Sequence, residues 1–440
     1  MPILPKEFVE RMGQQLGKEL PDFLLALEQE PVRGIRMNDA KPFDGMEHYM
    51  SGERVPWTSD GYLISHGNPA GSTIFHEAGG FYLQDPAAML PAEVLNAQPG
   101  EKILDLCAAP GGKSTQIGLK LLGDGLLVCN EPIPKRAIVL SRNIERMGIT
   151  NSIVISAYPE SIPYSWDNTF DGVLVDAPCS GEGMFRREPE TRCEWTLQKA
   201  KGCAERQRRI LDNSARFVRP GGHLVYSTCT YNPEENELAV LEFIKKHPEF
   251  YPEPFSFPEA EGKNGMLLLL PNRIKGEGQF VANLRKKGGT GKNSKMCIPF
   301  VHPAETILRR FREQFGYLQQ PNATFGNMLV HVPECPDLKG MRVLRAGYHL
   351  AEMRGEYLIP AHSAALANSR YTGPETEIDA QSASDYIAGK EISGNVKGWT
   401  VMKYRGLRIG WGKGSNSTIK NHYPKGLRKE RIITNPKGVL

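Results

Sequence analysis

The stretch Ile103-Leu-Asp-Leu-Cys-Ala-Ala-Pro-Gly-Gly-Lys113 combines an apolar run with two adjacent glycines. Its pattern predicts a buried strand, then a glycine turn, then a helix that begins near Ser114. Gly111 and Gly112 let the backbone approach a ligand closely, because neither residue carries a Cβ atom. The first amide groups of the helix point to the same place, and they suit the carboxylate end of S-adenosylmethionine. The alternative is a tight turn in another kind of α/β enzyme, and the loop alone leaves both open.

Two common nucleotide-binding motifs are absent from this stretch. G-x-x-x-x-G-K-[ST] does not occur, because only Gly111 and Gly112 precede Lys113, and G-x-G-x-x-G is missing as well. The next predicted strand, Leu126–Asn130, ends in Glu131. An acid at this place in a doubly wound fold can accept hydrogen bonds from ribose hydroxyls. An exposed strand-end glutamate is the alternative, and its pairing with the glycine turn favours the ribose contact.

Strand-like and helical segments alternate from Ala87 to about Lys287. Besides 102–106 and 126–130, the predicted strands are 153–156, 172–176 and 222–227, and the predicted helices are 114–122, 134–147, 206–217 and 234–246. This alternation indicates βαβ units, a parallel sheet and an α/β fold with helices on both faces. A ligand is then expected beyond the carboxyl ends of the strands.

The two flanks of this region have other patterns. Residues 1–90 predict a small α+β unit, with helices at 9–16 and 21–27 and a strand at 33–37. A Gly/Lys/Ser linker is predicted at 286–295, and a basic helix at 304–315 follows it. The chain of 440 residues is long enough for two to four domains. We predict four parts: 1–90, 91–287, 288–379 and 380–440.

Composition and the first residues predict a soluble cytoplasmic protein. The chain is 40% apolar and 24% charged, which is typical of globular proteins, and its net charge is only +4. Lys6 and Glu7 interrupt the N-terminus, so it does not resemble a signal peptide. The apolar run Met266–Leu270 is far shorter than the roughly 20 residues of a membrane span. The eight cysteines form no C-x-x-C pair and no dense disulfide pattern, so we expect no metal.

Two of these cysteines follow predicted buried strands. The strand Asp171–Asp176 runs into Ala-Pro-Cys179, and the strand from Gly222 ends in Ser-Thr-Cys229. Both cysteines are therefore expected at the carboxyl edge of the sheet, beside the cofactor. One such cysteine would more often be a buried packing residue. The presence of two cysteines at strand ends, one of them after an Asp and a Pro, favours a catalytic role.

A pyrimidine methyltransferase needs such a thiol. Carbon 5 of cytosine is a weak nucleophile, and a thiolate that adds to carbon 6 turns the ring into an enamine-like species that can attack a methyl sulfonium. The carbon 5 proton must then leave and the thiol must be expelled, which requires a base. Asp176 is placed to stabilise the protonated ring. The sequence alone does not decide which cysteine attacks.

These stretches resemble the RNA 5-methylcytosine methyltransferases of the NOL/NOP/Sun class. The matching segments are 105–115, 176–183 and 225–237, and the resemblance covers nearly the whole chain. Within the class, the ending Gly410–Lys413 and Lys420–Gly426 is similar to the bacterial small-subunit enzymes of the RsmF type. The resemblance implies a Rossmann-like S-adenosylmethionine methyltransferase domain, a small N-terminal α+β (RRM-like) domain and a C-terminal PUA-like RNA-binding region.

The resemblance also implies roles for individual residues. Cys229 matches the nucleophile, Cys179 matches the cysteine that assists product release, and Asp176 and Lys113 complete the catalytic set. The residues that match the cofactor site are Cys107, Ala108, Ala109, Pro110, Gly111, Gly112, Lys113, Glu131, Arg136 and Asp176. One departure concerns the adenine, because the family often has an acid after the third strand. Here Ala157 or Tyr158 lies there, so we expect backbone groups or stacking on Tyr158 to hold the adenine.

The end of the chain has the charge pattern of an RNA-binding surface. From Lys397 to Leu440 there are eleven Lys and Arg residues and one acid, Glu430. Basic residues contact phosphates, and aromatic residues stack on unpaired bases. The predicted RNA contacts are Lys413, Lys420, Lys425 and Arg428, together with Arg186 and Arg187 after the Cys179 loop. The alternative is a solvated basic surface with core aromatics. For Arg186 and Arg187, a phosphate contact and an ordinary surface position are equally matched.

The prediction is therefore methylation of cytosine carbon 5 in RNA, most specifically in small-subunit ribosomal RNA or its assembly intermediate. His422 is expected to bond locally or to face RNA, because no second metal ligand stands near it. Two rival functions remain open. One is methylation of a protein or small molecule, which needs neither the second cysteine nor a basic C-terminus. The other is an RNA-binding assembly factor without turnover, against which both intact cysteines argue.

Overall fold

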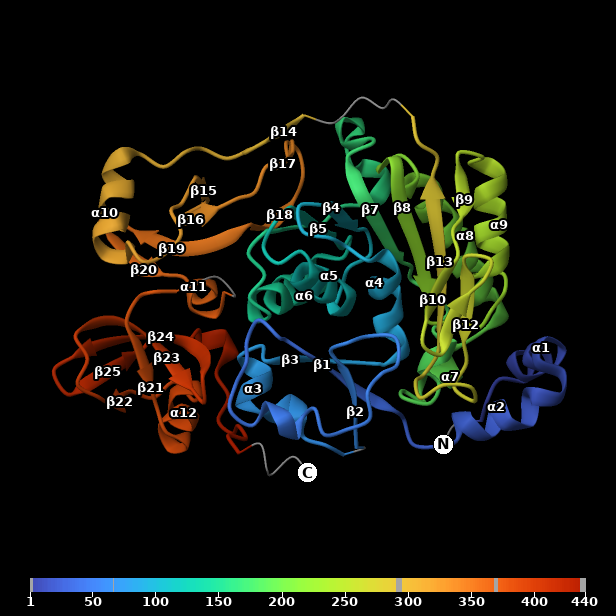
Figure 1. Cartoon of the computed structure of the whole chain (residues 1–440), viewed down its shortest axis with the longest axis horizontal. Helices are drawn as coiled ribbons and strands as arrows, with labels where there is room; N and C mark the ends of the chain where they lie inside the picture. The colour runs from blue at the N-terminus through green and yellow to red at the C-terminus, as the bar shows by residue number, and fades with distance from the viewer. Residues whose placement is uncertain (1–2, 66, 290–294, 368–370, 436–440) are drawn as a thin grey trace.

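The computed structural model describes residues 3–65, 67–289, 295–367 and 371–435 (Figure 1). At its centre lies a sheet in which five parallel strands follow the order β8-β7-β4-β5-β6. They are β4 (Lys102–Asp105), β5 (Leu126–Asn130), β6 (Ser152–Ile155), β7 (Phe170–Asp176) and β8 (Val218–Thr228). The predicted α/β sheet is thus confirmed. Because β4 lies between β5 and β7, the order reverses there, which is where such folds bind ligands.

Antiparallel strands extend this sheet at both ends. β13 (Gln279–Lys286) pairs with β8 and carries β12 (Met266–Leu269) and β9 (Phe250–Pro252), while β10 (Phe255–Phe257) and β11 (Ala260–Gly262) form a separate hairpin. At the other end, β18 (Val343–Ala346) pairs with β6 although it is nearly 200 residues away in the chain. Arg345 of β18 is buried and its Nη1 lies 2.8 Å from Glu145 Oε2. The region after residue 295 is therefore joined to the central sheet.

Helices cover both faces of the central sheet. One face packs α4 (Leu90–Leu95), α5 (Gly112–Lys120) and α6 (Pro134–Arg146), and the other packs α8 (Leu197–Ser214) and α9 (Glu237–Lys246). Ile103 faces the first layer and Leu104 faces the second, as expected for a strand buried on both sides. α8 begins nine residues before the predicted start. Thr196 caps it by accepting a hydrogen bond from Lys199 N, and its first turns are too polar to show a helical period.

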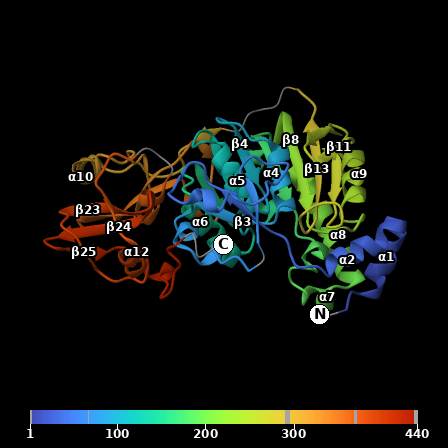
Figure 2. The ribbon, with the colours of Figure 1, turned by 60° about the horizontal axis from the view of Figure 1, so that its bottom comes forward.

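The N-terminal segment is divided between two places. Its helices α1 (Lys6–Leu16) and α2 (Leu20–Leu27) lie near α7 (Thr191–Glu194), at the end of the molecule opposite the C-terminal sheet (Figure 2). Its strands β1 (Arg33–Met37), β2 (Gly61–Ile64) and β3 (Phe81–Gln84) form an antiparallel sheet in the order β2-β1-β3. This sheet and α3 (Ile74–Glu77) share a core with the C-terminal unit.

Two small units complete the chain. The first has α10 (Glu305–Phe315), α11 (His362–Leu366) and the sheet β15 (Ala323–Phe325), β16 (Met328–His331), β19 (Tyr348–Arg354) and β20 (Tyr357–Pro360), and β14 (Met296–Cys297) pairs with β17 (Cys335–Pro336). The second has α12 (Ala380–Ile387) and a sheet in the order β21-β23-β24-β25-β22. Its strands are β21 (Glu375–Glu377), β22 (Ile392–Ser393), β23 (Gly398–Tyr404), β24 (Leu407–Ser415) and β25 (Thr418–Asn421). Part of the predicted linker, 290–294, lies outside the described residues.

Candidate active site

Two adjoining cavities open at the carboxyl ends of the parallel strands. One has a volume of about 290 Å³ and the other of about 630 Å³. Cys107, Ala109, Asp176 and Cys229 line both, so these residues form the boundary between them. They follow or end β4, β7 and β8. The sheet therefore brings together residues that the sequence separates by more than a hundred positions.

The larger cavity has the features of a nucleoside site. Glu131 is 2% exposed and accepts hydrogen bonds from Ile133 N at 3.0 Å, while Arg136 Nη1 lies 3.2 Å from its other oxygen. Tyr158, which is 64% exposed, lines the same cavity with Ile133. A strand-end carboxylate beside exposed apolar and aromatic side chains can take a ribose and an adenine.

The glycine turn lies between β4 and α5. Gly111 has φ of 114°, and an added Cβ atom would lie 3.2 Å from a methyl group of Leu140, so glycine is required there. Arg136 donates to the carbonyl of Ala109 at 2.9 Å and fixes the turn. The helix α5 begins at Gly112, two residues earlier than predicted, so its free amide groups include those of the glycine turn itself.

Asp105 leaves a place for a cation beside this turn. Its Oδ2 accepts a hydrogen bond from Ser114 Oγ at 2.6 Å, whereas its Oδ1 is buried and has no partner of hydrogen-bond geometry among the described residues. Burial raises the pKa of Asp105 to about 7. The residues lining the cavities thus fit S-adenosylmethionine, because its ammonium group would supply the missing donor.

The smaller cavity is richer in polar groups. Two basic side chains, Lys113 and Arg187, line it together with amide and carboxyl side chains. The amide and carboxyl side chains are those of Gln84, Asp85, Asp105, Asp176, Glu277 and Gln279. Lys113 Nζ lies 2.7 Å from Asp176 Oδ2, and Ser227 Oγ donates to Asp176 Oδ1 at 2.7 Å. Amide and carboxyl groups of this kind can recognise the polar edge of a base.

The two predicted cysteines are in contact. Cys179 Sγ and Cys229 Sγ are 3.3 Å apart, at the ends of the loops that follow β7 and β8. The hydrogen bond to Cys229 and burial raise the pKa of Cys179 well above its usual value. Cys179 therefore remains a protonated thiol and can donate its hydrogen to the Cys229 sulfur.

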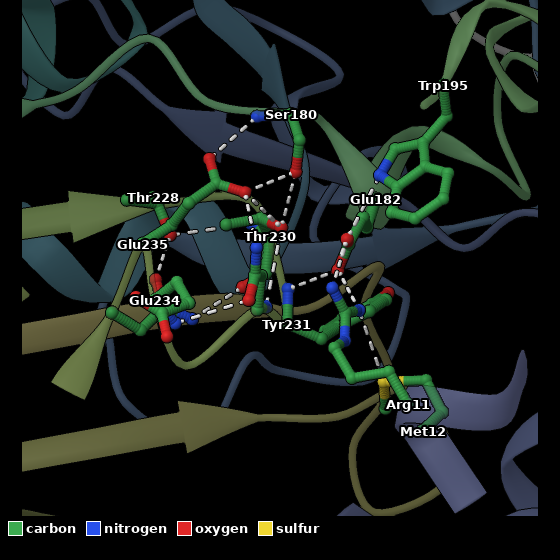
Figure 3. A network of polar contacts seen from close by, with 12 residues as sticks. Arg11, Met12, Ser180, Glu182, Trp195, Thr228, Thr230, Tyr231, Glu234 and Glu235 are labelled. Atoms are coloured by element: carbon green, nitrogen blue, oxygen red, sulfur yellow. Dashed lines mark hydrogen bonds and ion pairs between the residues drawn. The ribbon is translucent and has the colours of Figure 1, made fainter. Parts of the chain in front are cut away.

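A buried carboxylate fixes the two cysteine loops relative to each other (Figure 3). Glu235 accepts hydrogen bonds from Ser180 N and Gln207 Nε2, both at 2.9 Å, and from Asn232 Nδ2 at 3.2 Å. Ser180 Oγ is also 2.9 Å from Thr230 Oγ1. Ser180 and Thr230 each follow one of the cysteines directly. Glu235 consequently sets the spacing of the two sulfur atoms.

A second carboxylate ties the same loops to the N-terminal helices (Figure 3). Glu182 is fully buried and accepts hydrogen bonds from both terminal nitrogens of Arg11, at 2.8 and 2.7 Å. It also accepts from Trp195 Nε1 and from Tyr231 N, both at 3.1 Å. Phe8 and Phe23 of α1 and α2 pack against Tyr231 and Phe185 in one apolar cluster. The first two helices therefore support the cysteine loops.

Arg186 requires a correction. It was predicted to clamp a phosphate, but it is 5% exposed and its Nε lies 2.7 Å from Glu277 Oε2. It also donates to the carbonyls of Ala26 and Gly276. A guanidinium with these partners cannot reach RNA, so this prediction is wrong. The sequence could not separate it from Arg187, which is exposed and lines the smaller cavity.

The other predicted RNA contacts lie in the C-terminal unit, apart from the cavities. Lys413, Lys420, Lys425 and Arg428 are all exposed. Sequence reasoning missed the positioning residues Glu182 and Glu235, although both stand in the quoted segments. It also missed Arg206 and Arg209, which line the larger cavity from one face of α8. Their spacing of three along a helix was the available signal.

Two further searches concern the described part of the chain only. No helix in it is both long and apolar enough to cross a membrane. Within the same residues, no group of three or more His, Cys, Asp or Glu side chains is arranged to hold a metal ion.

Comparisons with known proteins match four family models to successive parts of the chain. A family model described as 16S rRNA methyltransferase RsmB/F matches residues 92–285. Three models specific to 16S rRNA methyltransferase RsmF match its N-terminal domain at residues 4–86, its first C-terminal domain at 310–367 and its PUA domain at 374–429. The predicted combination of a methyltransferase domain with an N-terminal and a PUA domain is confirmed.

Relatives of similar length support the same family. A protein named ribosomal RNA small subunit methyltransferase F from Enterobacter sp. (strain 638) is 32% identical, over 98% of this chain and 97% of that one. One of the same name from Aeromonas salmonicida (strain A449) is 32% identical over 98% of each chain. The solved structure of a methyltransferase homolog protein from Pyrococcus horikoshii is 28% identical, with a TM-score of 0.56 over 64% of this chain and 95% of that one. The chain belongs to the RsmF family of 16S rRNA methyltransferases.

Proposed function

We propose that this protein methylates carbon 5 of a cytosine in small-subunit ribosomal RNA, in the cytoplasm, through a transient bond from Cys229 to carbon 6. The observation that carries the proposal is the pair of sulfur atoms 3.3 Å apart at the boundary of the two cavities. A methyltransferase that acts on an oxygen or nitrogen atom needs no such pair, whereas one that acts on a pyrimidine carbon needs a nucleophile and a base.

S-adenosylmethionine is proposed to fill the larger cavity and to reach across the boundary with its amino-acid end, since Asp105, Gly112 and Lys113 line the smaller cavity. The turn at 107–113 would hold the amino-acid end, Glu131 the ribose hydroxyls, and Tyr158 with Ile133 the adenine. When bound, S-adenosylmethionine supplies the electrophilic methyl group. The cytosine would then lie in the smaller cavity, on the other side of Cys229 and Asp176. Arg187 is placed to contact a neighbouring phosphate.

Cys229 attacks carbon 6 as a thiolate, with the Cys179 thiol as hydrogen-bond donor. The ring accepts a proton at nitrogen 3, which the Lys113 ammonium supplies through the Asp176 carboxylate that it contacts, and Asp176 then stabilises the protonated nitrogen. The electron pair released at carbon 5 would form the new bond to the methyl group while the sulfonium–methyl bond breaks and the sulfur leaves as a neutral thioether. Carbon 5 then carries both a hydrogen and a methyl, and the carbon 6–sulfur bond breaks once that hydrogen leaves as a proton.

Alkylation of Cys229 changes the properties of Cys179. The bond to the Cys229 sulfur contributes most to the raised pKa of Cys179, ahead of burial. Once Cys229 is a neutral thioether, its sulfur is a weaker hydrogen-bond acceptor, and no thiolate lies beside Cys179 to repel a second negative charge. Cys179, which lines the larger cavity, then releases its own proton to solvent there more easily and, as a thiolate, can accept the carbon 5 proton. The same geometry thus keeps Cys179 protonated before attack and makes it a base afterwards.

The test is transfer of a tritiated methyl group to ribosomal RNA, followed by digestion to nucleosides. Label in 5-methylcytidine is expected. Label in another nucleoside would refute the site of methylation, label in protein would point to a protein substrate, and no label would point to an assembly factor without turnover. Comparing free RNA with assembled subunits in the same assay tests whether the target must be unpaired, since extrusion from a helix costs a few kcal/mol.

A second variant tests the release step. Cys179→Ser should still attack but should release its product slowly, because serine is a far weaker acid than a thiol and a poor proton acceptor. A covalent protein–RNA complex should accumulate and resist denaturing electrophoresis. The exposed Cys193→Ser variant is the matched control. Normal turnover of Cys179→Ser without a trapped complex would contradict the assigned role.

A further inference from the structure

A third cavity lies far from the cysteines, between the two small units at the C-terminal end. We name it the C-terminal groove, and its volume is about 640 Å³, within the range of about 300 to 1,000 Å³ typical of ligand sites. One wall comes from α10, β19 and β20, and the other from β23 and β24. Its lining residues are Gln314, Tyr317, Arg354, Tyr357, Leu358, Ile359, Pro374, Gly398, Trp399, Lys413 and His422.

The walls of the groove are held rigidly together. Trp411 of β24 is 1% exposed and donates its Nε1 hydrogen to the carbonyl of Ala361, at 2.8 Å. Phe315 of α10 lies 6.4 Å from the ring of Trp399, centroid to centroid. These residues belong to an apolar cluster that includes both units. The groove therefore exists before any ligand binds, which lowers the entropic cost of binding.

The groove is lined by aromatic rings that are partly or largely exposed. Tyr357 is 77% exposed at the start of β20. Trp399 is half-buried, and its ring is supported by His422 at 4.4 Å and by Trp411 at 6.4 Å. A supported ring beside an exposed one is suited to stacking with a flat ligand. Such stacking tolerates any base, because every base has a π face.

The charge around these rings is positive. Lys413 Nζ lies 5.2 Å from the centre of the Trp399 ring, and Lys420 is its partner across β24 and β25. Among the described residues, neither lysine has a carboxylate within ion-pair distance. Arg354 is 63% exposed and pairs with Glu352 at 2.9 Å. Burial and the charges of Lys413, Arg354 and Lys420 lower the pKa of His422. An anion is the ligand that relieves this crowding of cations.

We propose that the C-terminal groove binds an unpaired nucleotide of the RNA substrate, with its base against Trp399 and Tyr357 and its phosphates on Lys413 and Arg354. The proposal rests on the proposed function, which makes RNA the substrate. Flat rings and exposed cations together match single-stranded nucleic acid, whereas an acidic peptide would need the cations alone. The groove thus adds Arg354 and Tyr357, from outside the PUA-like unit, to the predicted basic residues.

Fluorescence titration of the full-length protein tests this proposal. The probe is a single-stranded oligoribonucleotide of about twelve nucleotides that carries one 2-aminopurine, whose emission changes on stacking. Tyr357→Ala should weaken binding roughly 5- to 150-fold and reduce the emission change, and Tyr357→Phe should restore both. Tyr164→Ala, at a tyrosine that is 83% exposed elsewhere on the molecule, is the matched control. Lys413→Gln should weaken binding and reduce its salt dependence.

The outcomes separate this proposal from the proposed function. Tyr357→Ala should raise KM for RNA in the methyl-transfer assay while kcat stays near that of the unaltered protein. Unchanged affinity and emission in Tyr357→Ala would overturn the groove proposal, even if the protein methylates RNA normally. Equal loss for duplex and single-stranded probes would also overturn it, since a paired base cannot stack in the groove. Absence of methyl transfer by the unaltered protein would instead refute the proposed function.

Discussion

The active-site cavities and the C-terminal groove are built in opposite ways. Around the cysteines, the buried carboxylates Glu182 and Glu235 hold the two cysteine loops by several hydrogen bonds. In the groove, Tyr357 and Lys413 are exposed and are held chiefly by the packing of two units behind them. Covalent chemistry needs atoms fixed within a fraction of an ångström, whereas stacking and phosphate contacts tolerate movement. Positioning by buried polar groups therefore marks the catalytic region.

The largest expected effect separates the two regions completely. Cys229→Ser should lower methyl transfer on the order of 10³-fold or more, because a hydroxyl cannot replace the thiolate. Binding of the 2-aminopurine probe in the C-terminal groove should not change. Radioactive methyl transfer and fluorescence titration on the same preparation measure both. Full turnover in this variant would show that Cys229 is not the nucleophile.

The second effect tests whether Glu235 acts only by positioning. Glu235→Ala removes the acceptor for Ser180 N and Gln207, so the spacing of the two sulfur atoms should relax. We expect kcat to fall on the order of 100-fold, as for a displacement of about 1 Å, with little change in KM. Glu234→Ala is the matched control, since the Glu234 side chain is 57% exposed and its carboxylate pairs only with Arg208 among the described residues. Rescue by Glu235→Gln would support positioning, and equal losses in Glu234→Ala would contradict it.

The smallest effect concerns stability and pH. Burial and the neighbouring Glu277 raise the pKa of Asp85 from 3.8 to about 7. The folded state therefore holds a proton on Asp85 that the unfolded chain releases near pH 4. The stabilisation that comes from holding this proton is complete below pH 4 and is lost as the pH rises to 7. Asp85→Asn has no carboxyl group at this position, so the unfolding free energy no longer falls through ionisation of residue 85 as the pH rises. Relative to the unaltered protein, the variant should gain about 2 kcal/mol between pH 4 and 8, since coupling to Glu277 reduces the full value.

Urea unfolding at a series of pH values measures this difference. Asp44→Asn, at an exposed carboxylate, serves as the control and should leave the profile unchanged. If the unfolding free energies of Asp85→Asn and of the unaltered protein change in parallel with pH, Asp85 is already ionised at pH 4. The cavity would then be a more polar environment than its packing indicates, and the contrast with the groove would be weaker.

The sequence predicted the regions in which structure is local. The strand Leu126–Asn130 was predicted to the residue, because continuous apolar runs between turns are typical of buried parallel strands. Cys179 and Cys229 could be assigned to the edge of the sheet from the sequence, because each closely follows the end of such a strand. The glycine turn was recognised for the same reason, although its helix begins two residues earlier than predicted.

The sequence could not predict features that depend on distant packing. Arg186 and Arg187 are neighbours of equal chemistry, and only the position of Glu277 decides that the first is buried. The groove joins 354–357 to 399–422 through the contact of Trp411 with Ala361, which no local pattern contains. The division of the N-terminal segment between two ends of the molecule also depends on cores formed much later in the chain.

The pairing of β18 with β6 has a consequence for how the protein can be cut. In residues 91–287 alone, β6 would be an edge strand with unpaired amide and carbonyl groups along one side. Its sequence Ser-Ile-Val-Ile carries no charge or proline that would discourage pairing with another copy. The isolated domain would therefore be prone to edge-to-edge aggregation, and the third part of the chain acts as a built-in cover against it.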